Sequence, residues 1–297
     1  MMAKHHGAIA ITGATGLIGS HLCEHFKRLG WEVRALVQPS EKYPFDPDGI
    51  RFCRCDLPDV LDTEAFRGAD VVIHAAYMTR FLGIKTGRRI NEDGTLRVLE
   101  AARSGEVRRF VFISTMSAHA KARSYYGMSK YKLEQTMDPA RDLVVRSGLV
   151  MATDGGLFNR MRGEIERARI VPVFDGGRQI VQTIHIDDIC EAFSRAIERD
   201  ITGTIAVGEP EGIEIRNLVL EIARRLGKNV RLVSVPHKPV VAALRLTEAL
   251  GIRLPISSEN VLGLVTLEHV PTADHLTRLG LTARTTRESL DSLFATT

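Results

Sequence analysis

The stretch that decides the fold is Ile9-Ala-Ile-Thr-Gly13-Ala-Thr-Gly16-Leu-Ile-Gly19, close to the start of the chain. It has the pattern of a buried strand, a glycine turn and the beginning of a helix. Gly13 permits a sharp turn, Gly16 lets the backbone approach a pyrophosphate, and Gly19 lets the helix pack closely on the sheet. The N-terminus of such a helix offers N–H groups and a positive dipole to phosphates. The stretch therefore predicts a dinucleotide-binding turn.

The residues of this turn that we expect to contact the dinucleotide are Gly13, Thr15, Gly16, Leu17, Ile18 and Gly19. A glycine pattern of this kind is weak evidence when it stands alone. Here it lies at the first junction between a strand and a helix, which is where the phosphate-binding mechanism requires it. The alternative is a purely structural turn.

Short apolar runs alternate with amphipathic helical stretches over the first half of the chain. The runs are rich in Val and Ile with little polar alternation, which is typical of parallel strands buried on both faces. The expected strands are residues 8–12, 32–37, 50–53, 71–74, 109–114 and 143–146, and the expected helices are residues 17–29, 93–103 and 124–137. The alternation predicts an α/β fold, a doubly wound parallel (Rossmann) sheet.

The pattern changes after Arg146, where glycines and Pro172 interrupt a looser region. Residues 184–199 have the pattern of a strand and helix that return to the sheet, and residues 214–226 and 240–250 that of later helices. We therefore expect a dinucleotide-binding domain of residues 1–150 plus about 180–202. The rest, about 151–179 plus 203–297, is expected to form a smaller C-terminal α/β substrate-binding lobe.

Composition and charge exclude several classes of protein. The 297 residues are 44% hydrophobic and 26% charged, and the net charge of +4 is scattered. No run of roughly 18 apolar residues is present to span a membrane, and the polar start lacks the apolar core of a secretory signal. No basic stripe with interleaved aromatic residues indicates nucleic-acid binding. We expect a cytoplasmic protein with a small-molecule substrate, without nucleic-acid or membrane partners, and leave a homodimer open.

The four cysteines are Cys23, Cys53, Cys55 and Cys190. Cys53 and Cys55 lie two apart on an expected strand, so both side chains would point to one face. Neither a second pair nor a histidine cluster completes a tetrahedral metal site. The sequence predicts free, partly buried thiols and no metal.

The chemistry-bearing motif is Tyr126-Gly-Met-Ser-Lys130, because residues four apart on a helix share one face. A free phenol has a pKa of about 10. A neighbouring ammonium, together with the positive charge of an oxidised nicotinamide, lowers that pKa. Tyr126 is then expected to act as a proton acid or base. The motif lies one helix after an expected strand that ends in Ser114-Thr115.

The glycine spacing and this motif resemble the extended short-chain dehydrogenase/reductase family, which includes NAD-dependent epimerases and dehydratases. The resemblance runs from Ile9 to about Arg199. It implies that Asp56-Leu57 contacts the adenine, that Ala75-Ala76 after His74 lies at the nicotinamide ribose, and that Asn91 positions its helix or a water in a proton relay.

The resemblance also implies roles around the proton transfer. Thr115 would donate a hydrogen bond to the substrate oxygen, with Ser117 as a second candidate, and Lys130 would hold the ribose. The expected catalytic residues are thus Tyr126, Lys130, Thr115 and Asn91. The expected substrate-binding residues are Met78, Ser117, Tyr126 and Arg178. His74 and His119, as single histidines near strand ends, are expected to be packing or loop residues.

The choice of dinucleotide depends on the end of the second strand. An NAD site usually carries an acid there to hold the ribose 2′-OH, and this chain has Val37. Arg34 or Lys42 could attract a 2′-phosphate, and Gln38 stands where NADP-binding relatives often carry arginine. The sequence favours NADP(H), with NAD(H) as the alternative.

Departures from the family pattern bear on the substrate. Val181 stands where many nucleotide-sugar enzymes carry an arginine, for which Arg178 could substitute. Met116 and Ser117 replace the acid pair of a dehydratase, which places dehydratase below the other reactions. The first hypothesis is a sugar-nucleotide epimerase or related sugar-modifying enzyme. The second is an NADPH-dependent carbonyl reductase on a non-sugar substrate, and the third a non-catalytic redox sensor that binds NADP(H).

Overall fold

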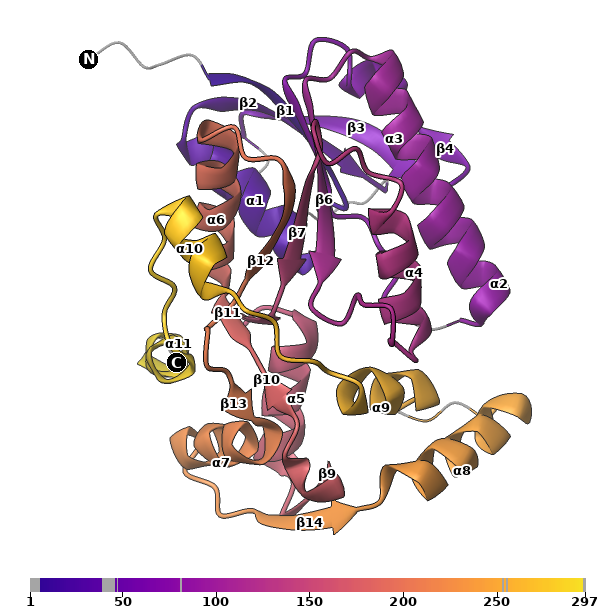
Figure 1. Ribbon diagram of the computed structural model, residues 1–297, viewed down its shortest axis with the longest axis vertical. Coiled ribbons are helices and arrows are strands. Elements are labelled where there is room, and N and C mark those ends of the chain that lie inside the picture. The colour runs from indigo at the N-terminus through magenta and orange to yellow at the C-terminus, as the bar shows by residue number, and fades with distance from the viewer. Residues whose placement is uncertain are drawn as a thin grey trace. The chain divides into compact units, whose positions relative to one another are not determined.

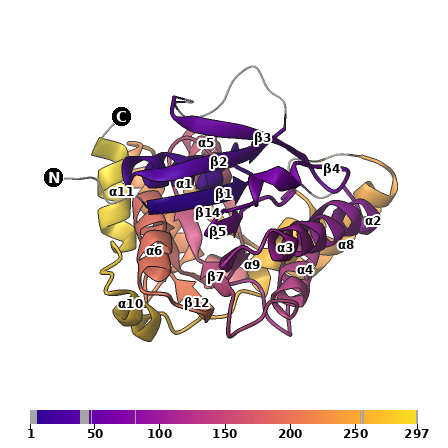
Figure 2. The same cartoon turned by 90° about the horizontal axis from the view of Figure 1, so that it is seen from above.

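The computed structural model describes residues 6–38, 46, 48–80, 82–252, 254 and 256–295. Its main feature is an eight-stranded, mostly parallel sheet in the order β12-β7-β6-β5-β1-β2-β3-β4 (Figure 1). The strands are β1 (His6–Thr12), β2 (Trp31–Val37), β3 (Ile50–Asp56), β4 (Val60–Leu61), β5 (Val71–His74), β6 (Arg109–Thr115), β7 (Leu143–Ser147) and β12 (Gly203–Val207). Figures 1 and 2 show β1, β2 and β3 side by side.

The strands β5 and β6 are buried along their whole length, as the apolar runs predict. All four residues of β5 and all seven of β6 are buried. β1 pairs in parallel with β2 and β5, and β5 with β6, while β4 closes the edge antiparallel to β3. Parallel strands need crossover helices on the sheet faces, and these helices exclude water from both sides. The predicted doubly wound α/β sheet is confirmed.

The helices follow the strands as expected. They are α1 (Leu17–Arg28), α3 (Gly94–Ser104), α4 (Tyr125–Glu134) and α6 (Ile186–Glu198). One helical segment of the structure was not expected from the sequence. The short helix α2 (Ile84–Gly87) and a π-helical turn (Arg88–Asp93) come before α3, so the helix begins well before residue 93. Such π-helical turns are rare and occur frequently at functional sites.

The chain divides into two compact units. The first comprises Met1–Ser114, Lys132–Arg146 and Cys190–Ile205, and the second Thr115–Tyr131, Ser147–Ile189 and Ala206–Thr297. Apolar residues from β1, β5, β6 and α3 form a core in the first unit, with Phe66, Phe110 and Phe112 fully buried.

The second unit contains three small sheets and most of the later helices. β8 (Leu149–Met151) pairs with β11 (Thr183–His185), β9 (Ile170–Phe174) with β14 (Arg231–Val235), and β10 (Ile180–Val181) with β13 (Ile213–Glu214). The helices are α5 (Gly156–Arg167), α7 (Ile215–Arg225), α8 (His237–Ala249), α9 (Ser258–Val265), α10 (Ala273–Leu279) and α11 (Thr286–Ala295). Phe158, Leu218, Ile222 and Leu290 lie at the centre of a core between α5, α7 and α11.

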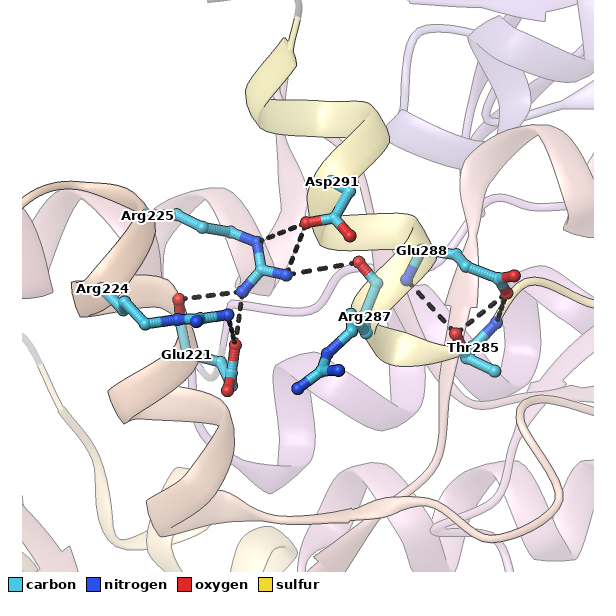
Figure 3. Close-up of polar contacts among 7 residues, drawn as sticks. All are labelled: Glu221, Arg224, Arg225, Thr285, Arg287, Glu288 and Asp291. Atoms are coloured by element: carbon cyan, nitrogen blue, oxygen red, sulfur yellow. Dashed lines mark hydrogen bonds and ion pairs between the residues drawn. The ribbon is translucent and has the colours of Figure 1, made fainter.

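The polar contacts in Figure 3 hold α7 to α11. Arg225 Nη2 donates to Asp291 Oδ1 at 2.7 Å, and its Nη1 donates to Glu221 Oε2 within α7. Thr285 caps α11, because its hydroxyl accepts from Glu288 N while Glu288 Oε2 accepts from Thr285 N. This reciprocal capping fixes where α11 begins.

All four cysteines are buried free thiols, which confirms the predicted thiol state. Burial raises the pKa of Cys23 and of Cys55 to about 12. Among the described residues no cluster of three histidine, cysteine or acidic side chains is arranged to hold a metal ion. None of the described helices has both the length and the apolarity needed to cross a bilayer.

Candidate active site

The glycine turn between β1 and α1 needs glycine at two positions. Gly13 has a φ of +63°, and a Cβ there would lie 2.6 Å from the Ala76 backbone. A Cβ at Gly19 would lie 2.2 Å from the Gly13 carbonyl oxygen. The turn and the close packing of α1 on β1 therefore depend on these two glycines.

Gly16 is different, because it is exposed and a Cβ there would lie 3.2 Å from Gly13 O. Its N–H donates to Gly13 O at 2.9 Å, which closes the turn. Gly16 immediately precedes α1, and the first turn of α1 carries no acidic residue. An exposed helix start without a capping side chain or a negative charge fits a pyrophosphate. The residues present are thus suitable to hold a dinucleotide, and the contacts of each residue with it stay a prediction.

A buried chain of hydrogen bonds orders the ends of β1 and β5. His74 Nδ1 contacts Thr12 Oγ1 at 2.7 Å, and its Nε2 contacts Thr95 Oγ1 at 2.9 Å. The Thr95 hydroxyl donates to Asn91 O at 2.6 Å, and Ala76 N donates to Thr12 Oγ1 at 3.2 Å. These assignments require the proton of a neutral His74 on Nε2. His74 is therefore a satisfied packing residue, which agrees with the expectation.

Asn91 lies in the π-helical turn and holds the segment that follows β5. Its Oδ1 accepts from Met78 N at 2.7 Å, and its Nδ2 donates to Met78 O at 3.2 Å. The side chain thus satisfies both backbone polar groups of Met78 and fixes residues 75–78, which include the Ala75-Ala76 pair. The sequence did not reveal Thr12 and Thr95, because no local pattern marks bonds across 62 and 21 positions.

The ends of β2 and β3 meet through two of the residues predicted to bind the dinucleotide. Gln38 Nε2 donates to Asp56 Oδ1 at 2.6 Å, and both side chains are exposed. Val37 stands at the position where an NAD site usually carries an acid, and its side chain is buried. Leu57 is half-buried and packs on the core of the first unit. Lys42 lies outside the described residues.

Arg34 has a role other than the expected one. Its side chain is buried, with Nε donating to Glu32 at 2.8 Å and Nη1 donating to Ala65 O at 3.1 Å and Arg67 O at 2.7 Å. A guanidinium that stabilises the loop after β4 in this way is not available as an open anion site. The expectation that Arg34 attracts a 2′-phosphate was therefore wrong.

The second group of predicted residues lies on β6 and α4. Tyr126 and Thr115 are hydrogen-bonded through their hydroxyls, and Thr115 Oγ1 also accepts from Ser117 N at 3.2 Å. Thr115 and Lys130 are buried, while Tyr126 is half-buried. The predicted tyrosine and threonine are thus in contact, and Lys130 follows one helical turn after the tyrosine.

The pKa of Tyr126 is raised above the usual phenol value, because burial penalises the phenolate, and the hydrogen bond with Thr115 opposes this rise. The direction is opposite to the lowering expected from Lys130. In the protein alone, desolvation outweighs the hydrogen bond with Thr115. Lowering by Lys130 together with an oxidised nicotinamide stays a prediction.

Gly127 explains how α4 comes close to the loop after β6. A Cβ at this position would lie 2.4 Å from Ser117 O and 2.9 Å from Ala122 Cβ. The glycine between Tyr126 and Met128 therefore lets the helix lie directly against residues 117–122. The tyrosine–lysine motif does not specify this residue, so nothing in the sequence indicated its role in packing.

A buried ion pair holds the other end of α4. Glu134 accepts from Ser114 Oγ, and Arg146 Nε donates to its two carboxylate oxygens at 2.9 and 3.2 Å. Glu134 lies one helical turn after Lys130 and is almost completely buried. This contact joins α4 to β6 and β7. It gives Arg146 a structural role that the family motif did not suggest.

The remaining predicted residues lie elsewhere in the second unit. Arg178 is exposed after the turn Asp175–Gly177, and Val181 is buried in β10. His119 Nε2 contacts Thr266 O at 3.0 Å, which fits the expected loop role. Asp188, in the first turn of α6, binds Arg284 through two contacts of 2.6 and 2.8 Å.

Several known proteins are similar to this chain. Ceramide reductase of Caulobacter vibrioides is 28% identical over 261 residues, with 84% of this chain and 80% of that protein covered. A 4-hydroxy-2-methyl-3-oxo-4-farnesyl-3,4-dihydroquinoline-1-oxide ketoreductase of Stigmatella aurantiaca is 26% identical, with 81% and 79% covered. The solved structure of MoeE5 with UDP-glucuronic acid and NAD has a similar fold, with a TM-score of 0.72, 19% identity, and 97% and 98% covered.

Residues 9–208 match the NAD dependent epimerase/dehydratase family. This segment includes the glycine turn, Asn91, Thr115 and the tyrosine–lysine motif, and it extends over more than half of the chain. The resemblance inferred from the sequence is confirmed: the chain belongs to the NAD-dependent epimerase/dehydratase family.

Proposed function

We propose that the chain is an NAD(P)-dependent carbonyl reductase that acts on a non-sugar substrate. The observation that supports this proposal is the hydroxyl–hydroxyl hydrogen bond between Tyr126 and Thr115, with Lys130 one turn further along α4. Two hydroxyls in contact, one of them a phenol, are suited to bind and protonate a single carbonyl oxygen.

The proposed steps assign one task to each side chain. When bound, the dinucleotide supplies the hydride that becomes bonded to the carbonyl carbon. Thr115 donates a hydrogen bond to the carbonyl oxygen and orients it. Tyr126 gives its phenolic proton to the same oxygen, so that the carbonyl becomes a carbinol and the phenol a phenolate. Lys130 stabilises that phenolate through its positive charge and holds the ribose.

The named relatives support reduction over epimerisation as the overall outcome. Two relatives that match about four fifths of their own length carry the names of reductases acting on ketones or lipids. Val181 is buried where sugar-nucleotide enzymes often carry an arginine, and Arg146 is bound to Glu134. We accordingly rank the carbonyl reductase above the epimerase, which reverses the order suggested by the sequence.

Sugar-nucleotide epimerisation is the second candidate. It is favoured by the fold similarity to MoeE5, which was solved with a UDP-sugar and NAD. An epimerase retains its dinucleotide through the cycle, whereas a reductase must exchange it. Dinucleotide that remains with the purified protein, and isomerised UDP-sugar without net oxidation, would favour this second candidate.

For the cofactor we propose NADP(H). Val37 offers no carboxylate to the ribose 2′-OH, and its own apolar side chain does not repel a 2′-phosphate. Since Arg34 is occupied, Gln38, which donates to Asp56, is the polar group that the described residues offer at the end of β2. The family description names NAD, so NAD(H) is the alternative.

The test is transfer of labelled hydride from NADPH and from NADH to a panel of long-chain ketones, simple ketones and UDP-sugars. We expect turnover of an apolar ketone by the wild-type protein and a loss of roughly 10²–10⁴-fold for Tyr126→Phe, because the proton route is removed while the ring remains. Ser117→Ala tests the second candidate for the role of Thr115 and should lower the rate far less than Tyr126→Phe. Equal rates for wild type and Tyr126→Phe on the same substrate would show the mechanism to be wrong.

A further inference from the structure

Helix α8 is apolar on both of its faces. Val241 and Leu244 point into a small core with Phe174, Val261 and Leu262. The opposite face, which is exposed, consists of Pro239, Ala242, Ala243, Leu246, Ala249 and Leu250. A surface helix normally presents polar residues to water, and a helix that is apolar all round is normally buried or in contact with lipid. The exposed face of α8 therefore needs an explanation other than packing.

The apolar surface continues beyond the helix. Gly251 has a φ of +74° and its N–H donates to Glu248 O, while Ile252 N donates to Thr247 O at 2.9 Å. These bonds form a Schellman turn, which ends α8 and directs the chain back along it. Leu246, Leu250, Ile252, Leu254 and Ile256 are 40% to 67% exposed. These five are one third of the fifteen large apolar side chains exposed in the described part of the chain.

Cations lie at the edge of this surface, and the acids near them are engaged in hydrogen bonds. Lys238 and Arg245 are exposed at the edge of the apolar face of α8. The one acid on the helix, Glu248, is turned toward α9, where Ser258 N and Oγ donate to its carboxylate at 2.7 Å each. His237 contacts Asp175. Asp175 is in electrostatic range of Lys238, and Glu259 is in range of Arg245, but both acids are hydrogen-bonded to other groups, Asp175 to His237 and Glu259 to Tyr125 N. The exposed face thus combines leucine and alanine with two cations on its rim.

We propose that this surface, termed here the α8 ridge (the exposed face of α8 together with Ile252, Leu254 and Ile256), contacts the surface of a bilayer that contains anionic lipids. An interfacial helix lies in the plane of the membrane with its apolar face among the acyl chains and its Lys and Arg side chains at the headgroups. The ridge has this distribution. The expectation of no membrane partner rested on the lack of a spanning segment, and interfacial contact requires none.

Charge decides between a bilayer and a second copy of the chain. The chain has a net charge of +4, and a two-fold contact through the ridge would bring Lys238 and Arg245 near the same residues of the partner. An anionic headgroup layer attracts these cations instead, by an amount that falls with ionic strength. The proposal rests on these residues alone and does not depend on the proposed reaction.

The test is co-sedimentation of the full chain with vesicles of phosphatidylcholine alone and of phosphatidylcholine mixed with phosphatidylglycerol. We expect binding to the mixed vesicles, weaker binding at high salt, and little binding to the neutral ones. Leu246→Glu with Leu250→Glu should lower the affinity by about tenfold or more, because acyl contact is lost. Lys238→Gln with Arg245→Gln should lower it by about fivefold for each charge removed.

The matched control is Leu157→Glu with Leu220→Glu, which alters two exposed leucines of the same unit outside the ridge. It should bind mixed vesicles like the wild type, and thermal unfolding of each variant verifies that it is folded. Absence of wild-type binding to mixed vesicles, or equal binding by the ridge variant, would overturn the proposal. A wild-type dimer in light scattering that the ridge variant dissociates, without vesicle binding, would assign the ridge to self-association instead.

Discussion

At the scale of single residues, the function depends on a few atoms whose surroundings the structure defines. The pKa of Tyr126 is raised by burial, so the phenol keeps its proton to a higher pH than a free phenol does. Carbonyl reduction needs that proton, and its rate should therefore hold at low pH and fall as the pH rises through the pKa of the bound complex. The reverse oxidation needs the phenolate and should show the opposite dependence.

Lys130→Met tests the electrostatic part of this argument. Removal of the positive charge should raise the pKa of Tyr126 further and move the pH profile of carbinol oxidation toward alkaline values. The rate at neutral pH should drop as well, because Lys130 is also assigned to the ribose. Stopped-flow rates across pH with saturating dinucleotide measure the shift. A profile that falls in amplitude without moving would leave Lys130 with a binding role only.

Cofactor preference is governed by one position at the end of β2. Val37→Asp should turn the preference toward NADH, because a carboxylate accepts from the ribose 2′-OH and repels a 2′-phosphate. Dissociation constants for NADPH and NADH, measured by calorimetry for both proteins, decide the matter. A clear preference of the wild-type chain for NADH would show that the missing acid was misinterpreted.

Gly16 offers the cleanest separation of binding from folding in the glycine turn. A Cβ at Gly19 would collide with Gly13 O, whereas one at Gly16 meets it only at 3.2 Å. Gly16→Val should therefore leave the fold intact and weaken the dinucleotide sharply, since the side chain occupies the phosphate's approach. Gly163→Ala is the control, because its Cβ would make ordinary contact at 3.5 Å. Unchanged dinucleotide affinity in Gly16→Val would contradict the assignment.

At the scale of elements, helix α4 depends on its buried ion pair. Removing Glu134 takes away the carboxylate that Arg146 and Ser114 both contact, and breaking a buried pair costs roughly 3–5 kcal/mol. Glu134→Ala should lower the free energy of unfolding by an amount of that order. Asp291→Ala at the exposed contact of α7 with α11 in Figure 3 should cost about 1 kcal/mol or less. Urea denaturation compares the two, and similar costs would show that burial does not govern these pairs.

Strands and helices could be predicted from the sequence where their residue pattern is local. The six expected strands lie where the Val- and Ile-rich runs placed them, and the Tyr126–Lys130 spacing required only helical geometry. The contacts of Ser114 with Glu134 and of His74 with Thr12 join distant positions, so no local pattern could reveal them. Arg34 was misinterpreted for the same reason: strand alternation does not show that three acceptors surround its guanidinium.

At the scale of the whole molecule, the chain passes repeatedly between its two units. The changes occur after Ser114, Tyr131, Arg146, Ile189 and Ile205, and each of the five falls within a strand or helix. Neither unit is a continuous stretch of chain, so we expect one cooperative unfolding transition. Deletion of residues 203–297 removes β12 from the edge of the main sheet and should yield an unfolded product. Two separate calorimetric transitions would contradict this expectation.

The buried cysteines have a practical consequence. With pKa values of about 12 at Cys23 and Cys55, almost no thiolate is present at neutral pH, and a reagent in solution has no access to the sulfur. A thiol-specific chromophore should therefore label the native chain only when a segment opens. Cys23 lies on α1, Cys53 and Cys55 on β3, and Cys190 on α6. The order in which the four sulfurs are labelled would therefore report which of these elements, α1, β3 or α6, opens first.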